Sequence, residues 1–224
     1  MRTFLRQNSL SLFFGVIFVA ALVGQAFAGH AAYNAEQVAD HLAPVSLSRY
    51  LTSSSFGVDV AENWQSEYLQ FLLYIVATVW LLQRGSPESK ELDKAGTESD
   101  RDQKVGPFAT PRSPAPARHG GLATRLYSSS LGLTMGAIFV ASWAAQSLAG
   151  QVAYNEERIA QLQAPITWVG YVTSADFWSR TLQNWQSEFL AVGSMAVLSI
   201  HLRQRGSPES KPVGSAHTST GVEG

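Results

Sequence analysis

The sequence predicts an all-α membrane protein with four transmembrane helices, arranged as two tandem parallel helical hairpins with helical outer loops. Three observations predict this fold. Hydrophobic side chains make up 46% of the 224 residues and gather in four blocks separated by polar segments. The second half of the chain repeats the first, because the pair Tyr33-Asn34 recurs 121 positions later as Tyr154-Asn155. Lys and Arg are concentrated in the segments that an even number of spans places on one side of a membrane.

Two of the four blocks are uncharged and long enough to cross a bilayer, and they cover 9–28 and 128–150. At a rise of ~1.5 Å per residue, roughly 20 residues cross a hydrocarbon layer ~30 Å thick. The first block also fits a secretory signal peptide, because Arg2 and Arg6 precede it and Ala26-Phe27-Ala28 forms a small-x-small cleavage site. Its copy at 128–150 is internal and cannot be a cleaved signal, so we expect the first block to be a retained span.

The other two blocks, 71–82 and 189–202, are too short to cross a bilayer alone. Each must include residues from its polar N-terminal flank to form a complete span. Ser55 and Asp176 are residue types that cap helices, so we expect the two helices to begin there.

A duplication defines the predicted domains. About 40 of the first 90 residues are identical to the residue 121 positions later, with no gap. We therefore predict two-span repeats over 1–90 and 122–211. The segment 91–121 is rich in Pro, Gly, Ser and charged residues, so we expect it to be a disordered cytoplasmic linker. The segment 212–224 is similar in composition and is expected to be a disordered tail.

The distribution of positive charge orients the predicted spans. The two predicted outer loops contain only Arg49, Arg158 and Arg180 as basic residues, whereas the termini and the linker carry the other Lys and Arg. Because positive residues favour the cytoplasmic side, both termini and the linker are predicted to be cytoplasmic. Each repeat has two spans, so the two repeats share one orientation and are parallel rather than inverted.

Composition excludes several classes of function. The chain has no cysteine, so it has no disulfide, no thiolate metal site and no Cys nucleophile. A formal net charge of −1 is unlike the basic surplus of a nucleic-acid-binding protein. Paired haem ligands are missing, since His30 and His41 are replaced by Gln151 and Leu162 in the second repeat. The chain contains no catalytic motif, so we expect neither an enzymatic activity nor a cofactor.

Two strings recur without change, NWQSE at 63–67 and 184–188, and QRGSPESK at 83–90 and 204–211. NWQSE followed by an aromatic residue and Leu, then a span and QRGSPESK, resembles a family of small bacterial membrane proteins of unknown function. The resemblance covers both halves apart from the linker and the tail. It implies a multi-pass protein of the bacterial inner membrane, and it brings no known activity and no catalytic residues.

QRGSPESK follows the second and the fourth predicted span on the predicted cytoplasmic side. We call these two the even spans, and the first and third the odd spans. Gly85 and Gly206 are placed for a left-handed helix C-cap, and Ser86-Pro87 resembles the start of a further helix. Arg84 and Lys90, with Arg205 and Lys211 in the second copy, are expected to contact lipid phosphates. The alternative is a docking motif for a cytoplasmic partner. For the pairs Tyr33-Asn34 and Tyr154-Asn155 we favour a role in packing the loops over a role in ligand binding.

A group of polar residues is predicted about one helical turn below the outer membrane boundary, on both even spans and both odd spans. One interpretation is that these residues lie at the interface and fix helix packing. The other is a pair of membrane-embedded carboxylates, each held by an amide, that bind protons or cations. The predicted cluster consists of Gln25, Asn63, Ser66, Glu67, Gln146, Asn184, Ser187 and Glu188.

The sequence therefore favours a non-enzymatic structural or interaction protein of the cell membrane. Its expected partners are the lipid bilayer and either a second copy of the chain or another membrane protein, with no nucleic acid. The alternative function is a small proton- or cation-coupled transporter or channel that uses Glu67 and Glu188.

Overall fold

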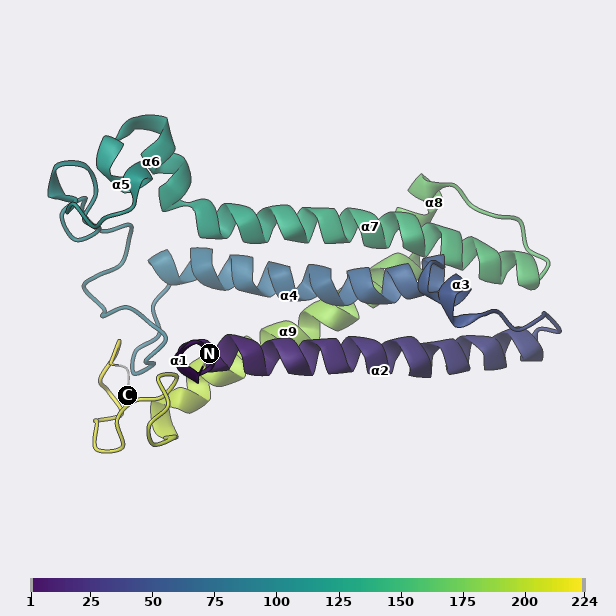
Figure 1. The fold of residues 1–224 in the computed structure, drawn as a ribbon, viewed down its shortest axis with the longest axis horizontal. Helices are drawn as coiled ribbons and strands as arrows, with labels where there is room; N and C mark the ends of the chain where they lie inside the picture. The colour runs from purple at the N-terminus through teal and green to yellow at the C-terminus, as the bar shows by residue number, and fades with distance from the viewer. Residues whose placement is uncertain (1, 223–224) are drawn as a thin grey trace. The chain divides into compact units, whose positions relative to one another are not determined.

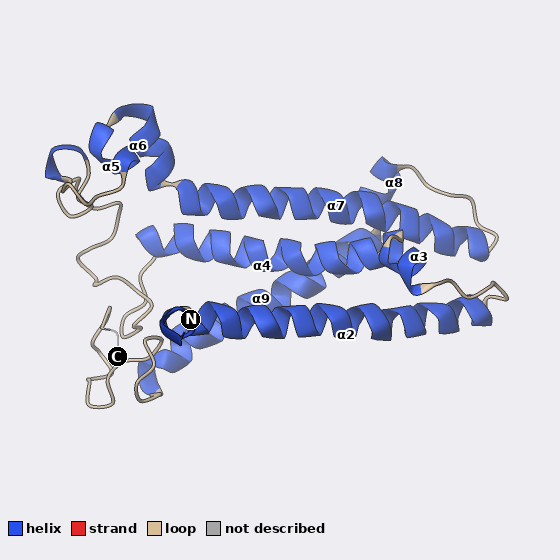
Figure 2. Ribbon diagram, viewed as in Figure 1, coloured by secondary structure: helices blue, strands red, loops and turns tan. Residues whose placement is uncertain are grey.

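The computed structural model describes residues 2–222, and every regular element within them is helical (Figure 2). The prediction of an all-α fold is therefore confirmed. Figure 1 shows the elements in chain order: α1 (Arg2–Gln7), α2 (Ser9–Ala39), α3 (Leu47–Leu51), α4 (Ser54–Trp80), η1 (Gly106–Phe108), α5 (Ala115–His119), α6 (Gly121–Ser128), α7 (Ser130–Ala160), α8 (Trp168–Val172) and α9 (Ala175–His201).

Helices of equal length follow one another in the same order in the two halves. The helices α2, α3 and α4 contain 31, 5 and 27 residues, and α7, α8 and α9 have the same three lengths. The loop after α2 and the loop after α7 therefore each contain a short helix, as the sequence predicts.

The described chain divides into two compact units. The first comprises Met1–Ala61 and Ala145–Phe177, and the second comprises Glu62–Ala144 and Trp178–Gly224. The helices α4, α7 and α9 run without a break from one unit into the other.

Two helices, α2 and α7, are long and apolar enough to cross a membrane. The most apolar stretch of α2 has none of its residues buried, and 17% of the corresponding stretch of α7 is buried. The helices α4 and α9 are ~40 Å long at ~1.5 Å per residue, so they are long enough to cross a membrane. The polar residues of their N-terminal halves make them less apolar than α2 and α7. Two of the four predicted spans are thus supported by length and composition.

In the first unit, an asparagine holds the loop that contains α3 to α2, and another holds the loop that contains α8 to α7. The Asn34 side chain donates to the Val45 carbonyl at 3.0 Å and accepts from the Val45 N–H at 2.8 Å. Asn155 makes the same two bonds to Ile166, at 2.9 and 2.8 Å. The predicted loop-packing role of the Tyr-Asn pairs is confirmed for their asparagines.

Each short loop helix buries one tyrosine against the preceding long helix. Tyr50 and Tyr171 are 2% and 1% exposed. A Cβ atom at Gly29 would lie 2.2 Å from the Tyr50 hydroxyl oxygen, and one at Gly150 would lie 2.3 Å from that of Tyr171. These two positions therefore require glycine because no side chain fits beside the tyrosine.

The N-termini of α4 and α9 differ slightly from the predicted positions. The Ser53 hydroxyl accepts from the Phe56 N–H, and the Ser174 hydroxyl accepts from the Phe177 N–H, both at 3.3 Å. The prediction that Ser55 and Asp176 cap these helices is wrong, because the serine two residues earlier in each repeat satisfies a free N–H of the first turn.

Candidate functional site

The interior of the second unit is polar. Among its described residues, the buried side chains are mostly hydroxyls, with one amide and one ammonium, and they include Gln65, Ser66, Ser86, Ser142, Thr181, Ser199 and Lys211. Large apolar side chains of the same unit, such as Phe71 and Leu190, are exposed. Soluble proteins show the opposite distribution, with apolar side chains inside and amides on the surface.

A tryptophan–glutamine cluster, formed by Gln65, Trp143, Trp178 and Trp185, joins α4, α7 and α9 within this unit. The Trp185 indole N–H donates to Gln65 Oε1 at 2.8 Å. The Trp143 ring centroid lies 6.2 Å from that of Trp178 and 6.0 Å from that of Trp185. Gln65 is fully buried, and its Nε2 has no hydrogen-bond partner among the described residues. The single Trp185 bond therefore orients a buried amide whose donor side stays available.

One ion pair in the same unit joins α9 to α4. Arg180 Nη1 lies 3.2 Å from Glu62 Oε2, and the Glu62 side chain is 16% exposed. A partly exposed pair of this kind stabilises a fold by ~1 kcal/mol or less. Its main effect is therefore to fix how the N-terminal halves of the two helices face each other.

The predicted polar cluster is divided between the two units. Gln25 and Gln146 belong to the first unit, and the residues on α4 and α9 belong to the second. Ser66 and Ser187 donate to carbonyls of their own helices, those of Asn63 at 2.9 Å and Asn184 at 2.8 Å. These two hydroxyls thus serve backbone groups and do not bind the carboxylates.

The two carboxylates of the predicted cluster interact with each other within the second unit. Glu67 is exposed and Glu188 is half-buried, and the two are close enough for electrostatic interaction. Neither forms a hydrogen bond or an ion pair with another described residue. The predicted support of each carboxylate by an amide is therefore not part of the described geometry.

QRGSPESK forms a closed turn after the C-terminal end of α4 and of α9. Gly85 and Gly206 have φ values of 86° and 80°, so the predicted left-handed glycines are confirmed. The predicted helix after Ser86-Pro87 is wrong. The Ser86 hydroxyl accepts from the Glu88 N–H at 3.2 Å and the Ser89 hydroxyl accepts from the Gln83 N–H at 2.9 Å, which closes a turn instead.

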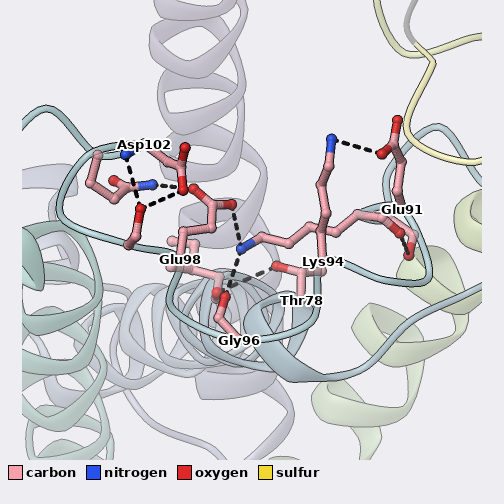
Figure 3. Close-up of polar contacts among 11 residues, drawn as sticks. Thr78, Glu91, Lys94, Gly96, Glu98 and Asp102 are labelled. Atoms are coloured by element: carbon pink, nitrogen blue, oxygen red, sulfur yellow. Dashed lines mark hydrogen bonds and ion pairs between the residues drawn. The ribbon is translucent and has the colours of Figure 1, made fainter.

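The last lysine of each motif binds the segment that follows it, and we call this arrangement the lysine clasp. Lys90 Nζ donates to the Gly96 carbonyl at 2.8 Å and pairs with Glu98 Oε1 at 2.8 Å (Figure 3). Hydrogen bonds from Lys90 and Gln103 hold the pKa of Glu98 below its ordinary value. Lys90 is thus engaged within the chain.

Lys211 is more fully enclosed than Lys90, with 1% of its surface exposed. Its ammonium donates to the carbonyls of Gly85, Ala216, His217 and Ser219 at 2.6, 3.2, 2.9 and 3.2 Å. Burial and the nearby Arg203 charge lower the pKa of Lys211, whereas carbonyl oxygens favour the ammonium form. The expectation that Lys211 contacts lipid phosphates is wrong because its donors are used by backbone oxygens.

The clasped segments also cover the C-terminal carbonyls of the even helices. The Gly96 N–H donates to the Val79 carbonyl at 2.7 Å, which satisfies one orphan group at the end of α4. At the end of α9, His217 Nδ1 lies 3.0 Å from the Ile200 carbonyl, and Arg203 Nη1 donates to the same carbonyl at 3.1 Å. QRGSPESK therefore serves to return the chain onto the helix that it follows.

The two copies of Pro-Glu from this motif line one cleft of about 220 Å³ in the second unit, formed by Pro87, Glu88, Pro208 and Glu209. The Tyr74 hydroxyl donates to Glu88 Oε2 at 2.7 Å and holds that carboxylate at the cleft. Within residues 2–222, no three His, Cys, Asp or Glu side chains are grouped so that they could hold a metal ion.

The model of one protein family, described as a domain of unknown function (DUF6766), matches residues 1–222. The chain belongs to this family. No curated protein and no solved structure matches the sequence. Membership of the DUF6766 family agrees with the resemblance to an uncharacterised family, and it assigns no activity.

Sequence reasoning about this DUF6766 chain missed the pairing of Gln65 with Trp185. The string NWQSE contains both residue types, and its exact duplication was the available signal. Trp143, which packs against Trp185, corresponds to Leu22 in the first repeat, so this part of the cluster shows no repeated pattern.

Proposed function

We propose that this DUF6766 chain is a four-span protein of the bacterial inner membrane with a structural or interaction role and no enzymatic turnover. The observation that carries the proposal is the reversed distribution of polarity, with amides and hydroxyls inside and large apolar side chains outside. Lipid is the solvent that stabilises such a surface, since apolar side chains facing hydrocarbon carry no hydration cost.

The apolar side chains exposed on α2 allow an estimate of the free-energy cost of placing this surface in water. Placing one large apolar side chain in water rather than in an apolar medium costs roughly 1.5–3 kcal/mol. Nine such residues would cost on the order of 15–25 kcal/mol, which exceeds the usual net stability of a domain, about 5–15 kcal/mol. The nine residues counted, which are among the exposed large apolar side chains of α2, are Leu10, Phe13, Phe14, Val16, Ile17, Phe18, Val19, Val23 and Phe27.

The two even helices complete the four spans of the proposal. They are continuous over 27 residues each, and the chain returns after each of them by the same turn. The clamps at Asn34 and Asn155 likewise form identical bonds in the two halves. Such repetition supports two parallel hairpins, and the distribution of Lys and Arg supports cytoplasmic termini.

Membrane topology tests the proposal directly. The chain should stay in the membrane pellet after extraction at alkaline pH, which removes peripheral proteins. Single cysteines in place of exposed Ser48 or Gln161 should react with an impermeant maleimide in intact cells, whereas Thr97→Cys should react only after lysis. Reaction at Thr97 without reaction at Ser48 would reverse the orientation, and release of the chain by alkali would reject the membrane assignment.

A second candidate function, proton- or cation-coupled transport, is supported by the electrostatic interaction between Glu67 and Glu188. Two carboxylates at equivalent positions of the repeats can share one cation or proton. If they do so, Glu67→Gln and Glu188→Gln should each abolish solute-coupled flux in liposomes while the helical content is kept. If the carboxylates only fix packing, both Gln variants should behave as the wild type and both Leu variants should lose stability. Glu36→Gln, outside the spans, is the matched control.

A further inference from the structure

The C-terminal segment covers one of the two QRGSPESK turns. We name Arg84–Pro87 the first turn and Arg205–Pro208 the second turn. The Gly85 N–H donates to the Thr220 hydroxyl at 2.9 Å, and the Gly221 N–H donates to the Ser86 carbonyl at 3.1 Å. Gly85, Ser86 and Pro87 are buried as a result. The first turn thus binds an extended segment through one hydroxyl and one backbone N–H.

The second turn has the same sequence and lies open. Gly206 and Pro208 are exposed, and a Cβ atom at Gly206 would meet nothing within 4 Å. A Cβ atom at Gly85 would instead lie 2.5 Å from the His217 carbonyl oxygen. The second turn therefore presents the Gly206 N–H and the Ser207 carbonyl without a covering segment, although that carbonyl also accepts from the Ser210 N–H of its own motif at 3.3 Å.

The linker contains the segment that corresponds to the tail. At the repeat offset, Ser99 matches Thr220 and Asp100 matches Gly221, so a hydroxyl and a backbone N–H stand in the same order. The lysine clasp also matches, because Lys90 and Lys211 each donate to the carbonyl six residues later, at 2.8 and 2.9 Å. Linker and tail therefore leave their turns by the same path.

The two paths separate at Glu98. This residue has a φ of +65°, a left-handed conformation that is unfavourable for any residue with a Cβ atom. Its carboxylate is held there by Lys90 and Gln103, and Ser99 donates to Asp102 Oδ2 at 2.6 Å (Figure 3). The corresponding Ser219 has a negative φ, and the tail continues onto the first turn. Strain is thus concentrated where the linker turns away from the second turn.

We infer that linker residues Glu98–Asp100 are a strap that closes over the second turn, with the Glu98 backbone as its hinge. Closure places the Ser99 hydroxyl on the Gly206 N–H and the Asp100 N–H on the Ser207 carbonyl, as Thr220 and Gly221 are placed on the first turn. The first turn ends at Pro87 and the second at Pro208, both of which line the cleft. Strap closure therefore covers the second side of the cleft, as the tail covers the first. This inference does not depend on the proposed membrane role.

Distances between spin labels on the full chain test the strap. The distance between labels at Thr97→Cys and Arg205→Cys reports on closure, and both positions are exposed. The pair at Arg84→Cys and Thr218→Cys, also exposed and displaced by the repeat offset, gives the distance expected for a closed turn. Because the chain has no cysteine of its own, each labelled protein carries only the intended pair.

Two substitutions at the hinge shift the population in opposite directions. Glu98→Pro fixes φ near −65° and forbids the open path, so the Thr97–Arg205 distance should shorten to that of the reference pair. Glu98→Gly removes the penalty of the left-handed conformation, so the short-distance population should fall by roughly fivefold from its wild-type level. Adding Ser99→Ala to Glu98→Pro should lengthen the distance again.

The strap is rejected if the Glu98→Pro protein keeps the long Thr97–Arg205 distance. It is also rejected if Ser99→Ala has no effect on a shortened distance, since the closed state is assigned to that hydroxyl. The reference pair and the far-ultraviolet circular dichroism spectrum should be unchanged in every variant. A change in either would show that the hinge substitution acts on the fold of the unit, and the strap would then not be an independent element.

Discussion

Replacement of Gly150 by alanine should lower the free energy of unfolding by about 1–3 kcal/mol, the usual cost of overpacking a core. The new Cβ atom would lie 2.3 Å from the hydroxyl oxygen and 2.9 Å from Cζ of Tyr171. The ring cannot move aside freely, because its centroid lies 5.5 Å from those of both Tyr154 and Phe177. Thermal unfolding of the purified protein in detergent, followed by tryptophan fluorescence, measures the change.

A matched glycine on the other long helix provides the control for this substitution. A Cβ atom at Gly24 meets nothing within 4 Å, so Gly24→Ala should be neutral or stabilise α2 by up to ~1 kcal/mol through helix propensity. Combining Gly150→Ala with Tyr171→Phe removes the closest atom and should recover part of the loss. Equal unfolding temperatures for the Gly150→Ala and Gly24→Ala proteins would contradict the close packing of Tyr171.

Lys211→Met should detach the C-terminal segment from the first turn. Methionine fills a similar volume but donates no hydrogen bond, so four carbonyl oxygens lose their common donor. Losing hydrogen bonds from a charged group costs roughly 1.5–3 kcal/mol, which corresponds to at least a tenfold weaker attachment. Hydrogen–deuterium exchange should show faster exchange at the Gly85 and Gly221 amides.

The equivalent lysine separates a local effect from a general loss of stability. Lys90 binds the linker, so Lys90→Met should speed exchange at the Gly96 amide and leave Gly221 protected. The tail would not be held by Lys211 if the Gly221 amide exchanged at the same rate in the Lys211→Met and wild-type proteins.

Local patterns in the sequence were sufficient for the helices and for the glycines of the turns. The apolar blocks 9–28 and 128–150 predict α2 and α7 because both blocks are long and uncharged, and α2–α4 and α7–α9 have matching lengths. Ser86-Pro87 was read as a helix start because that dipeptide favours one locally. The helix does not form because hydrogen bonds return the chain to α4. The Gly96 N–H donates to the Val79 carbonyl at the end of α4, and the Lys90 ammonium donates to the Gly96 carbonyl.

Contacts between distant parts of the chain were beyond sequence reasoning. Lys211 and Gly85 are joined across 126 positions, and a lysine near a chain terminus ordinarily stays in solvent. The pairing of Gln65 with Trp185 likewise depends on Trp143, which has no counterpart in the first repeat. The helical periodicity of the sequence does not indicate which side chains make such contacts.

The tryptophan–glutamine cluster gives the two copies of the duplicated string different tolerance to substitution. Gln65 and Gln186 are the same residue in duplicated strings, yet Gln65 is fully buried and Gln186 is exposed. Natural selection acts on the environment of a side chain and not on its ancestry. Replacement of Gln186 is therefore expected to change the stability of the protein less than the same replacement of Gln65, so equal residues of the two halves tolerate substitution unequally wherever only one copy is enclosed.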